Sequence, residues 1–278
     1  MAAGTDGIRD GARTARTLMH TVLGEAVAPH GETVWQESLV AGLGSLGVSA
    51  IAARQVIARA TREGLLKSER VGRRSLMHLS EDGLALLREG RQRTLSFGDQ
   101  PAWDGRWLLV AMTIPEERRE IRYRFRTQLE WLGFGSLGNG LWISPHAEHE
   151  SEALALLDSG EVGVESFVFV TDRLASHTPA ELARTAWDLD SLQQRYDAFL
   201  REFSGQRPET PEQKFSSWIR LYSDWRHFPQ FDPELPESLL PPEWPRGRAR
   251  ELFLACDAQW SGPAIEYFRD LDGQTLDS

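Results

Sequence analysis

The sequence predicts an α+β protein of several domains. Its first third shows helix-like apolar periodicity around a short basic hairpin, and its middle third alternates strand-like and helix-like runs. Its last third is helical and rich in aromatic residues. A chain of 278 residues with 41% hydrophobic residues is long enough for two or three domains with their own cores. We therefore expect a helical head, a mixed α/β centre and a mainly helical end.

The head is predicted to contain four helices. Residues 1–12 are small and polar, and we expect them to be disordered. Apolar residues that recur on one face predict helices over 14–28 and 33–43, and a last helix over 80–93. The remaining helix lies between the second and the last, directly before the hairpin.

This helix and the hairpin predict the function of the head. Ser49 is suited to cap the helix, and Gly64 to end it. The expected inward stripe consists of Val48, Ala52, Val56 and Ala60, with Ile57 beside it. Two short runs, 65–71 and 75–79, then form a hairpin with arginines at its tip. A capped helix followed by a basic hairpin is the order of a winged helix-turn-helix, whose helix enters the major groove of DNA. We assign residues 13–95 to such a domain.

The charge distribution agrees with a DNA-binding head. The chain carries a net charge of −10, but residues 1–98 hold 13 Lys and Arg against 10 Asp and Glu, whereas residues 99–278 hold 18 against 31. An acidic body with a basic head is typical of a DNA-binding module joined to a domain with another task. The alternative is a small helical domain with a solvated basic face.

The residues expected to contact DNA lie on the outer face of the helix and in the hairpin. A rotation of about 100° per residue places the candidates on the helix opposite its apolar stripe. Ile51 also points outward, and we interpret it as a contact to a thymine methyl group. The candidate DNA-binding residues are Ser49, Ala50, Arg54, Gln55, Ala58, Arg62, Arg70, Arg73 and Arg74.

The middle of the chain, residues 96–178, predicts a ferredoxin-like domain. A linker leads into a strand over 107–114, and the following segments read as helix, hairpin, helix and strand. This gives the order strand, helix, strand, strand, helix, strand. The last strand contains Phe167-Val168-Phe169-Val170, which we expect to be buried.

Residues 179–278 predict a mainly helical domain that is rich in aromatic residues. Helices are expected over 188–203, 211–226, 248–260 and 263–271. A proline-rich segment, 228–245, crosses between the second and third of them.

Four motifs in order resemble one protein family. They are the wing Glu69-Arg70-Val71-Gly72-Arg73-Arg74-Ser75, the opening Trp103-Asp104-Gly105-x-Trp107, the hairpin Gly133-Phe134-Gly135 to Leu141-Trp142-Ile143-Ser144-Pro145, and the late Phe231-Asp232-Pro233-x-Leu235-Pro236 to Leu239-Leu240-Pro241-x-x-Trp244-Pro245. Together they resemble the PaaX family of bacterial repressors of phenylacetic acid degradation. The resemblance spans the chain from about residue 14.

The resemblance implies a homodimeric, cytoplasmic transcription regulator with the three domains outlined above, of which residues 179–278 would serve effector binding and dimerisation. It also implies that an aromatic acyl-CoA such as phenylacetyl-CoA releases the protein from double-stranded operator DNA. Members regulate other catabolic operons too, so the effector does not follow from the motifs. The recognition helix is less basic than the serine-containing versions typical of the family, and we expect a different operator.

Two groups of residues are candidates for binding such an effector. Arg118, Arg122 and Arg126 recur at four-residue spacing and suit the phosphates of coenzyme A. The alternative is a solvated face paired with Glu116, Glu117 and Glu120. Trp218, Tyr222 and Trp225 suit one side of a pocket for an aromatic acyl group, with Arg220 and Arg226 as polar partners. The alternative for these rings is ordinary core packing.

An enzyme is the competing hypothesis, as an acyl-CoA or nucleic-acid hydrolase. The central domain also resembles small ferredoxin-like proteins of CRISPR spacer acquisition, which carry an aspartate where this chain has Thr113. The sequence shows no nucleophile, triad, phosphate loop or metal-ligand spacing, and its single cysteine, Cys256, excludes internal disulfides. We expect no catalytic residue, metal or cofactor. Without an apolar run of 18 residues, we expect no membrane partner.

Overall fold

The computed structural model describes residues 13–99, 102–158, 165–173 and 175–274. It shows a mixed α/β protein with one three-stranded and one four-stranded antiparallel sheet. The chain divides into two compact units. The first combines the chain up to residue 97 with residues 197–228 and the chain from residue 247 onward, and the second combines 98–196 with 229–246. Most of the C-terminal helical region therefore packs with the head. The predicted division into three consecutive domains stays a prediction.

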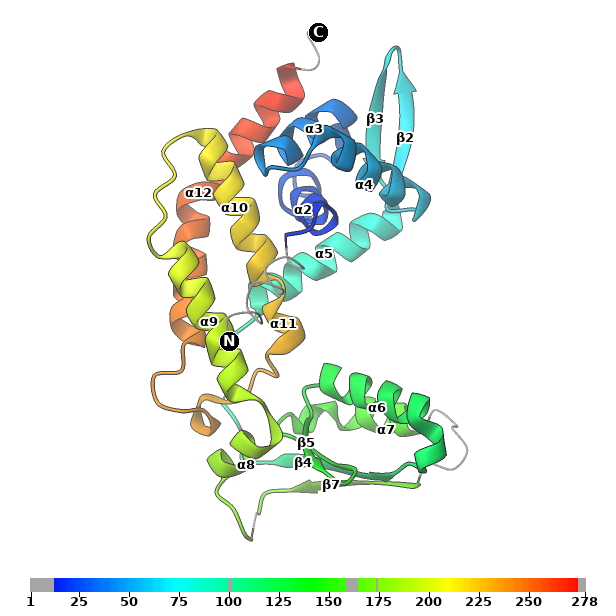
Figure 1. Ribbon diagram of the computed structural model, residues 1–278, viewed down its shortest axis with the longest axis vertical. Coiled ribbons are helices and arrows are strands. Elements are labelled where there is room, and N and C mark those ends of the chain that lie inside the picture. Colours follow the sequence, from blue (N-terminus) through cyan, green and yellow to red (C-terminus); the bar gives the residue numbers. More distant parts are fainter. Residues whose placement is uncertain (1–12, 100–101, 159–164, 174, 275–278) are drawn as a thin grey trace. The chain divides into compact units, whose positions relative to one another are not determined.

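Four helices form the head of the first unit. They are α2 (Ala15–Val22) with a π-helical continuation, η1 (Leu23–Val27), then α3 (Gln36–Ser45), α4 (Ala50–Arg62) and α5 (Glu81–Ser96). Figure 1 shows α2 enclosed by the other three. Leu18, Met19 and Val22 of α2 are fully or almost fully buried, so α2 is the central helix of the head.

The sheet of the head contains a strand where a helix is predicted. Residues 33–35 form β1 (Thr33–Trp35), which pairs with β3 (Arg74–Leu79), while β3 pairs with β2 (Leu66–Val71). The prediction of a helix from residue 33 is wrong at its start. β-Branched and aromatic residues favour strands, and β3 offers a free edge, so these three residues pair with it before α3 begins.

The C-terminal helices of the first unit pack against the head. They are the second half of α9 (Leu189–Phe203), α10 (Pro211–Trp225) and α12 (Arg246–Gln274). The two helices predicted over 248–260 and 263–271 form the single helix α12, with Pro263 inside it. A proline removes one backbone hydrogen bond and need not end a helix.

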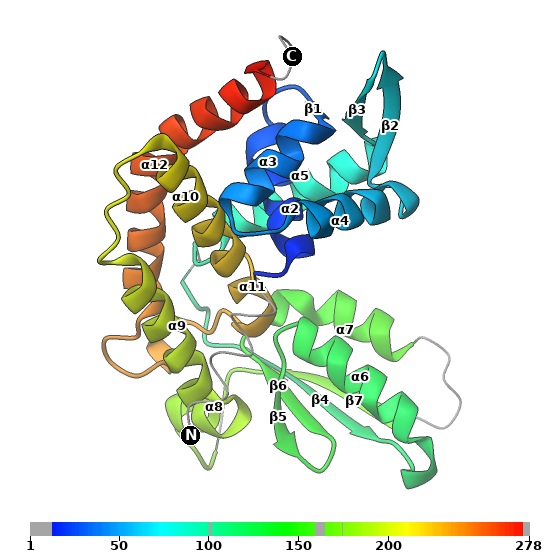
Figure 2. The same cartoon turned by 45° about the horizontal axis from the view of Figure 1, so that its top comes forward.

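The second unit contains the four-stranded sheet. Its elements are β4 (Trp107–Thr113), η2 (Glu116–Arg118), α6 (Arg119–Trp131), β5 (Gly135–Gly138), β6 (Leu141–Ser144), η3 (Ala147–His149), α7 (Glu150–Leu157) and β7 (Glu165–Thr171). They are followed by α8 (Pro179–Ala186), the first half of α9, α11 (Phe228–Phe231) except its first residue, and η4 (Glu237–Leu239). The strand order is β5-β6-β4-β7. Figure 2 shows α6 and α7 on the same face of this sheet. The predicted order of strands and helices is confirmed.

Strand β7 is less buried than its sequence predicts. Phe167 and Phe169 are each 54% exposed, and their rings stack with centroids 6.4 Å apart. Val168 points to the other face, where it packs with the core under α6 and α7. The expectation of a buried strand is wrong because β7 lies at the edge of the sheet, and only one of its faces is covered.

Candidate nucleic-acid interface and ligand pocket

Helix α4 begins and ends as its sequence predicts. The Ser49 hydroxyl accepts a hydrogen bond from the Ala52 backbone N–H at 3.3 Å, and Gly64 adopts a φ of +82° just beyond the end. Ala53, Ile57 and Ala60 are buried. The buried stripe therefore includes Ala53 in place of the predicted Ala52, which is only half-buried.

The outer face of α4 is open to solvent. Arg54, Gln55, Ala58 and Arg62 are all exposed, as are Ser49 and Ala50 at the start of the helix. Ile51 is 71% exposed. The structure thus brings the predicted helix residues together on one surface, and their contact with DNA stays a prediction.

The hairpin separates its three candidate arginines. Arg70 and Arg73 are exposed near the tip, and the Arg70 Nε donates to the Gly72 carbonyl at 3.1 Å. Arg74 turns the other way. Its Cζ lies 4.0 Å from the centroid of the Trp35 ring, and its side chain is only 22% exposed. This placement ties Arg74 to the head itself, and it favours a structural role over the predicted DNA contact.

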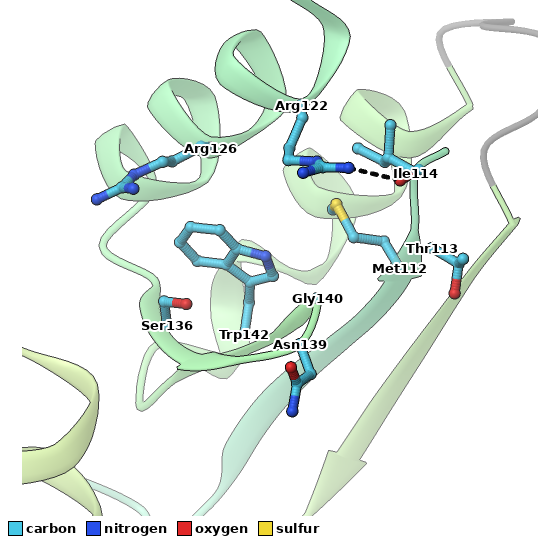
Figure 3. Close-up of a pocket in the computed structure, with 9 residues that line it drawn as sticks. All are labelled: Met112, Thr113, Ile114, Arg122, Arg126, Ser136, Asn139, Gly140 and Trp142. Carbon is cyan, nitrogen blue, oxygen red and sulfur yellow. Dashed lines mark hydrogen bonds between the residues drawn. The ribbon is translucent and has the colours of Figure 1, made fainter. Parts of the chain in front are cut away.

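A pocket of about 470 Å³ lies in the second unit. It is lined by Met112, Thr113, Ile114, Arg122, Arg126, Ser136, Asn139, Gly140 and Trp142. Figure 3 shows the Trp142 ring between the two arginines of α6 and the β5–β6 hairpin. The hairpin side of this pocket was not predicted from the sequence, because no local pattern shows that the hairpin faces α6.

Of the three arginines predicted to form a row, only Arg122 and Arg126 lie in α6. Arg118 lies in η2, before α6, and does not line the pocket. The Arg122 guanidinium donates to the Ile114 carbonyl at 3.1 Å, and Arg126 pairs with Glu130 at 2.8 Å. Both side chains that line the pocket are exposed, so a ligand can compete for them.

The C-terminal aromatic residues occupy a core. Trp218, Tyr222 and Trp225 are each at most 2% exposed. The indole N–H of Trp218 donates to Asp257 at 2.8 Å, and that of Trp225 to the Thr94 carbonyl at 3.1 Å. These contacts correspond to the core-packing alternative. Arg220, on the same helix, is half-buried.

A cluster of charged groups is buried beside Arg226. Glu25 accepts a hydrogen bond from Arg91 at 2.9 Å, and burial raises the pKa of Glu25 to about 7. Burial and the neighbouring Arg226 lower the pKa of His20 to about 4. The cavity that Tyr222 and Arg226 share with these groups measures about 10 Å³, room for at most one water molecule and none for an acyl group.

Comparison with known proteins agrees with the sequence motifs. Three family models match: "PaaX-like protein" over residues 14–83, "PaaX protein central Cas2-like domain" over 100–183 and "PaaX-like protein C-terminal domain" over 187–270. The transcriptional repressor PaaX of Escherichia coli (strain K12) is 31% identical over 275 residues, covering 93% of this chain and 84% of the relative. This chain belongs to the PaaX family.

A solved structure shares the fold. An uncharacterized protein from Mycobacterium tuberculosis aligns with a TM-score of 0.64 and 21% identity, covering 92% of this family member and 99% of that chain. In the described part of the chain, no group of three or more His, Cys, Asp or Glu residues is placed to hold a metal ion. None of the described helices is both long and apolar enough to cross a membrane.

Proposed function

We propose that this protein is a transcriptional regulator whose head binds double-stranded DNA as a winged helix-turn-helix. The observation that carries the proposal is the exposed face of α4, with Arg54 and Arg62, followed by the hairpin that exposes Arg70 and Arg73. Family membership and the name of the E. coli relative support the same function.

The geometry of α4 suits the major groove. That groove is about 12 Å wide, close to the diameter of a helix with its side chains. The small residues Ala50 and Ala58 on the exposed face allow the backbone to approach the bases. Arg54 is placed to read a base edge, whereas Arg73 at the hairpin tip meets the phosphate backbone.

Three arginine variants of the full chain test this mode of binding. The probe is a duplex selected by the protein from a randomised pool. Arg54→Ala should cost about 1–3 kcal/mol on that duplex and relax its sequence preference. Arg73→Ala should weaken binding to all duplexes alike and make the dependence of log K on log salt concentration shallower by about one.

Arg88→Ala, which replaces an exposed α5 arginine paired with Glu32, serves as the control and should change neither the sequence preference nor the salt dependence. Equal effects of all three variants, or selection of no duplex, would refute the proposal.

We further propose that the regulator acts as a homodimer. The exposed Phe167 and Phe169 on the edge strand β7 form an apolar surface suited to a second copy of this chain. A double Phe167→Ser, Phe169→Ser variant should sediment as a monomer, whereas Tyr123→Ser, on a still more exposed aromatic residue of α6, should not. Inserting five base pairs between half-sites should abolish tight binding. A dimer that survives the double substitution would refute this surface.

The proposed effector is an aromatic acyl-CoA such as phenylacetyl-CoA, which would release the regulator from the operator of an aromatic-acid catabolic operon. Arg122 and Arg126 at the pocket are suited to phosphate groups, and a pocket of about 470 Å³ lies within the range of ligand sites. We place the effector here rather than among Trp218, Tyr222 and Trp225, because those side chains are themselves packed in a core.

Calorimetry with a panel of acyl-CoAs and their free acids tests this site. Arg122→Ala should weaken binding of the cognate thioester, whereas Arg118→Ala, outside the pocket, should not. Because coupling is reciprocal, the factor by which the effector weakens DNA binding must equal the factor by which DNA weakens effector binding. Free acids that bind as tightly as thioesters would show that the arginines hold no phosphate.

A further inference from the structure

Ile51 is the most exposed large aliphatic residue among the described residues of the chain, at 71%. Single exposed apolar residues are common and need no explanation by themselves. Ile51 differs because of its position. It is the second residue after the Ser49 cap, in the first turn of α4, which is the part of a recognition helix that contacts base edges.

Viewed along the axis of α4, Ile51 lies within the face that we assign to DNA, at the N-terminal end of that face. With about 100° between successive residues, it is within about 60° of every other candidate on that face. Those candidates are Arg54, Gln55, Ala58 and Arg62, all of them exposed. The candidates that follow Ile51 on this face therefore present long polar or very small side chains. Ile51 is the one branched apolar side chain in this described surface.

Ile51 contributes little to the stability of the folded head. Isoleucine is a poorer helix former than alanine, because its branched side chain loses rotamer freedom in a helix. Its exposure means that its apolar surface stays in water. Ile57, on the opposite face, fills the core instead. An apolar side chain held in water among arginines stabilises the protein only once a partner covers it.

We propose that Ile51 reads the 5-methyl group of a thymine in the major groove. This inference rests on the proposed DNA binding. Thymine alone among the four bases presents a methyl group there, and apolar side chains contact it. DNA is favoured over a protein partner because Ile51 lies in the first turn of α4, the part of a recognition helix that contacts base edges. The operator should therefore require thymine at one position of each half-site.

Replacing thymine by deoxyuridine removes only the methyl group and leaves base pairing intact. The full chain is used to select a duplex from a randomised pool, and each thymine of the bound sequence is then replaced in turn. For the wild-type protein, one position per half-site should raise Kd by roughly 3- to 10-fold, the effect expected from one buried methyl group. Ile51→Ala should raise Kd on the unmodified duplex by a similar factor and lose its sensitivity to that replacement.

Leu86→Ala is the matched control. Leu86 is an aliphatic residue of α5, 57% exposed, and its variant should retain the wild-type profile at every thymine. If no replacement affects the wild-type protein, or if Ile51→Ala stays as sensitive as the wild type, the inference is overturned while DNA binding stands. If none of the three proteins selects a duplex, the proposed function itself fails, and the inference falls with it.

Discussion

Two glycines of α3 should respond oppositely to the same substitution. A Cβ added to Gly42 would lie 2.8 Å from the Phe268 ring of α12, whereas one added to Gly44 would meet nothing within 4 Å. The Phe268 ring is 3% exposed and stacks on Phe215 at 5.5 Å, so it has little room to move. The pair therefore tests whether the end of α12 packs on the head.

The magnitudes follow from two effects. Alanine is favoured over glycine inside a helix by about 1 kcal/mol, and both variants gain up to this amount. Only Gly42→Ala also overpacks the core, which costs about 1–3 kcal/mol. The two variants should differ by about 2 kcal/mol. For a unit of this size that corresponds to melting temperatures about 4–8 °C apart in calorimetry, with Gly44→Ala the more stable.

A double-mutant cycle isolates the contact. In a Phe268→Ala background the ring is absent, so Gly42→Ala should stabilise the protein as Gly44→Ala does. Equal shifts of the two glycine variants in the wild-type background would show that α12 does not pack on α3 in this way.

Three further outcomes follow from the contacts. Arg74→Ala should destabilise the head by about 1 kcal/mol in urea unfolding, through loss of its contact with an indole, and leave the salt slope of DNA binding unchanged. Asp232→Ala should cost about 3–5 kcal/mol in urea unfolding, because it leaves the buried Arg246 unpaired, and adding Arg246→Met should recover part of the loss. The raised pKa of Glu25 contributes stability that is present below pH 4.5 and is lost as the pH rises to about 7. The lowered pKa of His20 has the opposite effect: it contributes stability that is present above pH 6.5 and is lost as the pH falls to about 4. Urea midpoints from pH 4.5 to 6.5 should therefore rise with pH in Glu25→Gln and fall with pH in His20→Asn.

The sequence predicted those elements whose signals are local. Ser49 and Gly64 delimit α4 through their own conformations, and the order of elements in the second unit follows from periodicity and turns. The strand β1 was missed because three residues carry no periodicity, and only pairing with β3 defines it. The exposure of Phe167 depends on what covers the second face of the sheet, which the strand's own residues do not encode.

The candidate site was predictable where exposure alone defines it. The outer face of α4 follows from the helical repeat, even though the inward stripe is centred on Ala53 instead of Ala52. Side chains whose surroundings come from distant segments were not predictable. Arg74 packs over Trp35, and Trp218 meets Asp257, each across a separation that sequence periodicity does not span.

We propose that the C-terminal helices of the first unit contribute to DNA recognition by holding α3 in place. The end of α3 is held from two sides: the Ser216 hydroxyl of α10 donates to the Ser45 carbonyl at 2.8 Å, and the Tyr267 hydroxyl of α12 lies 2.9 Å from the Ser45 hydroxyl. Helix α4 begins five residues after Ser45, so the position of its first turn depends on α3. Base readout needs that turn held in place before binding, because ordering it on the DNA would reduce affinity. Under the proposed function, the part of the chain that the sequence assigns to a separate domain thus preorganises α4 for DNA binding.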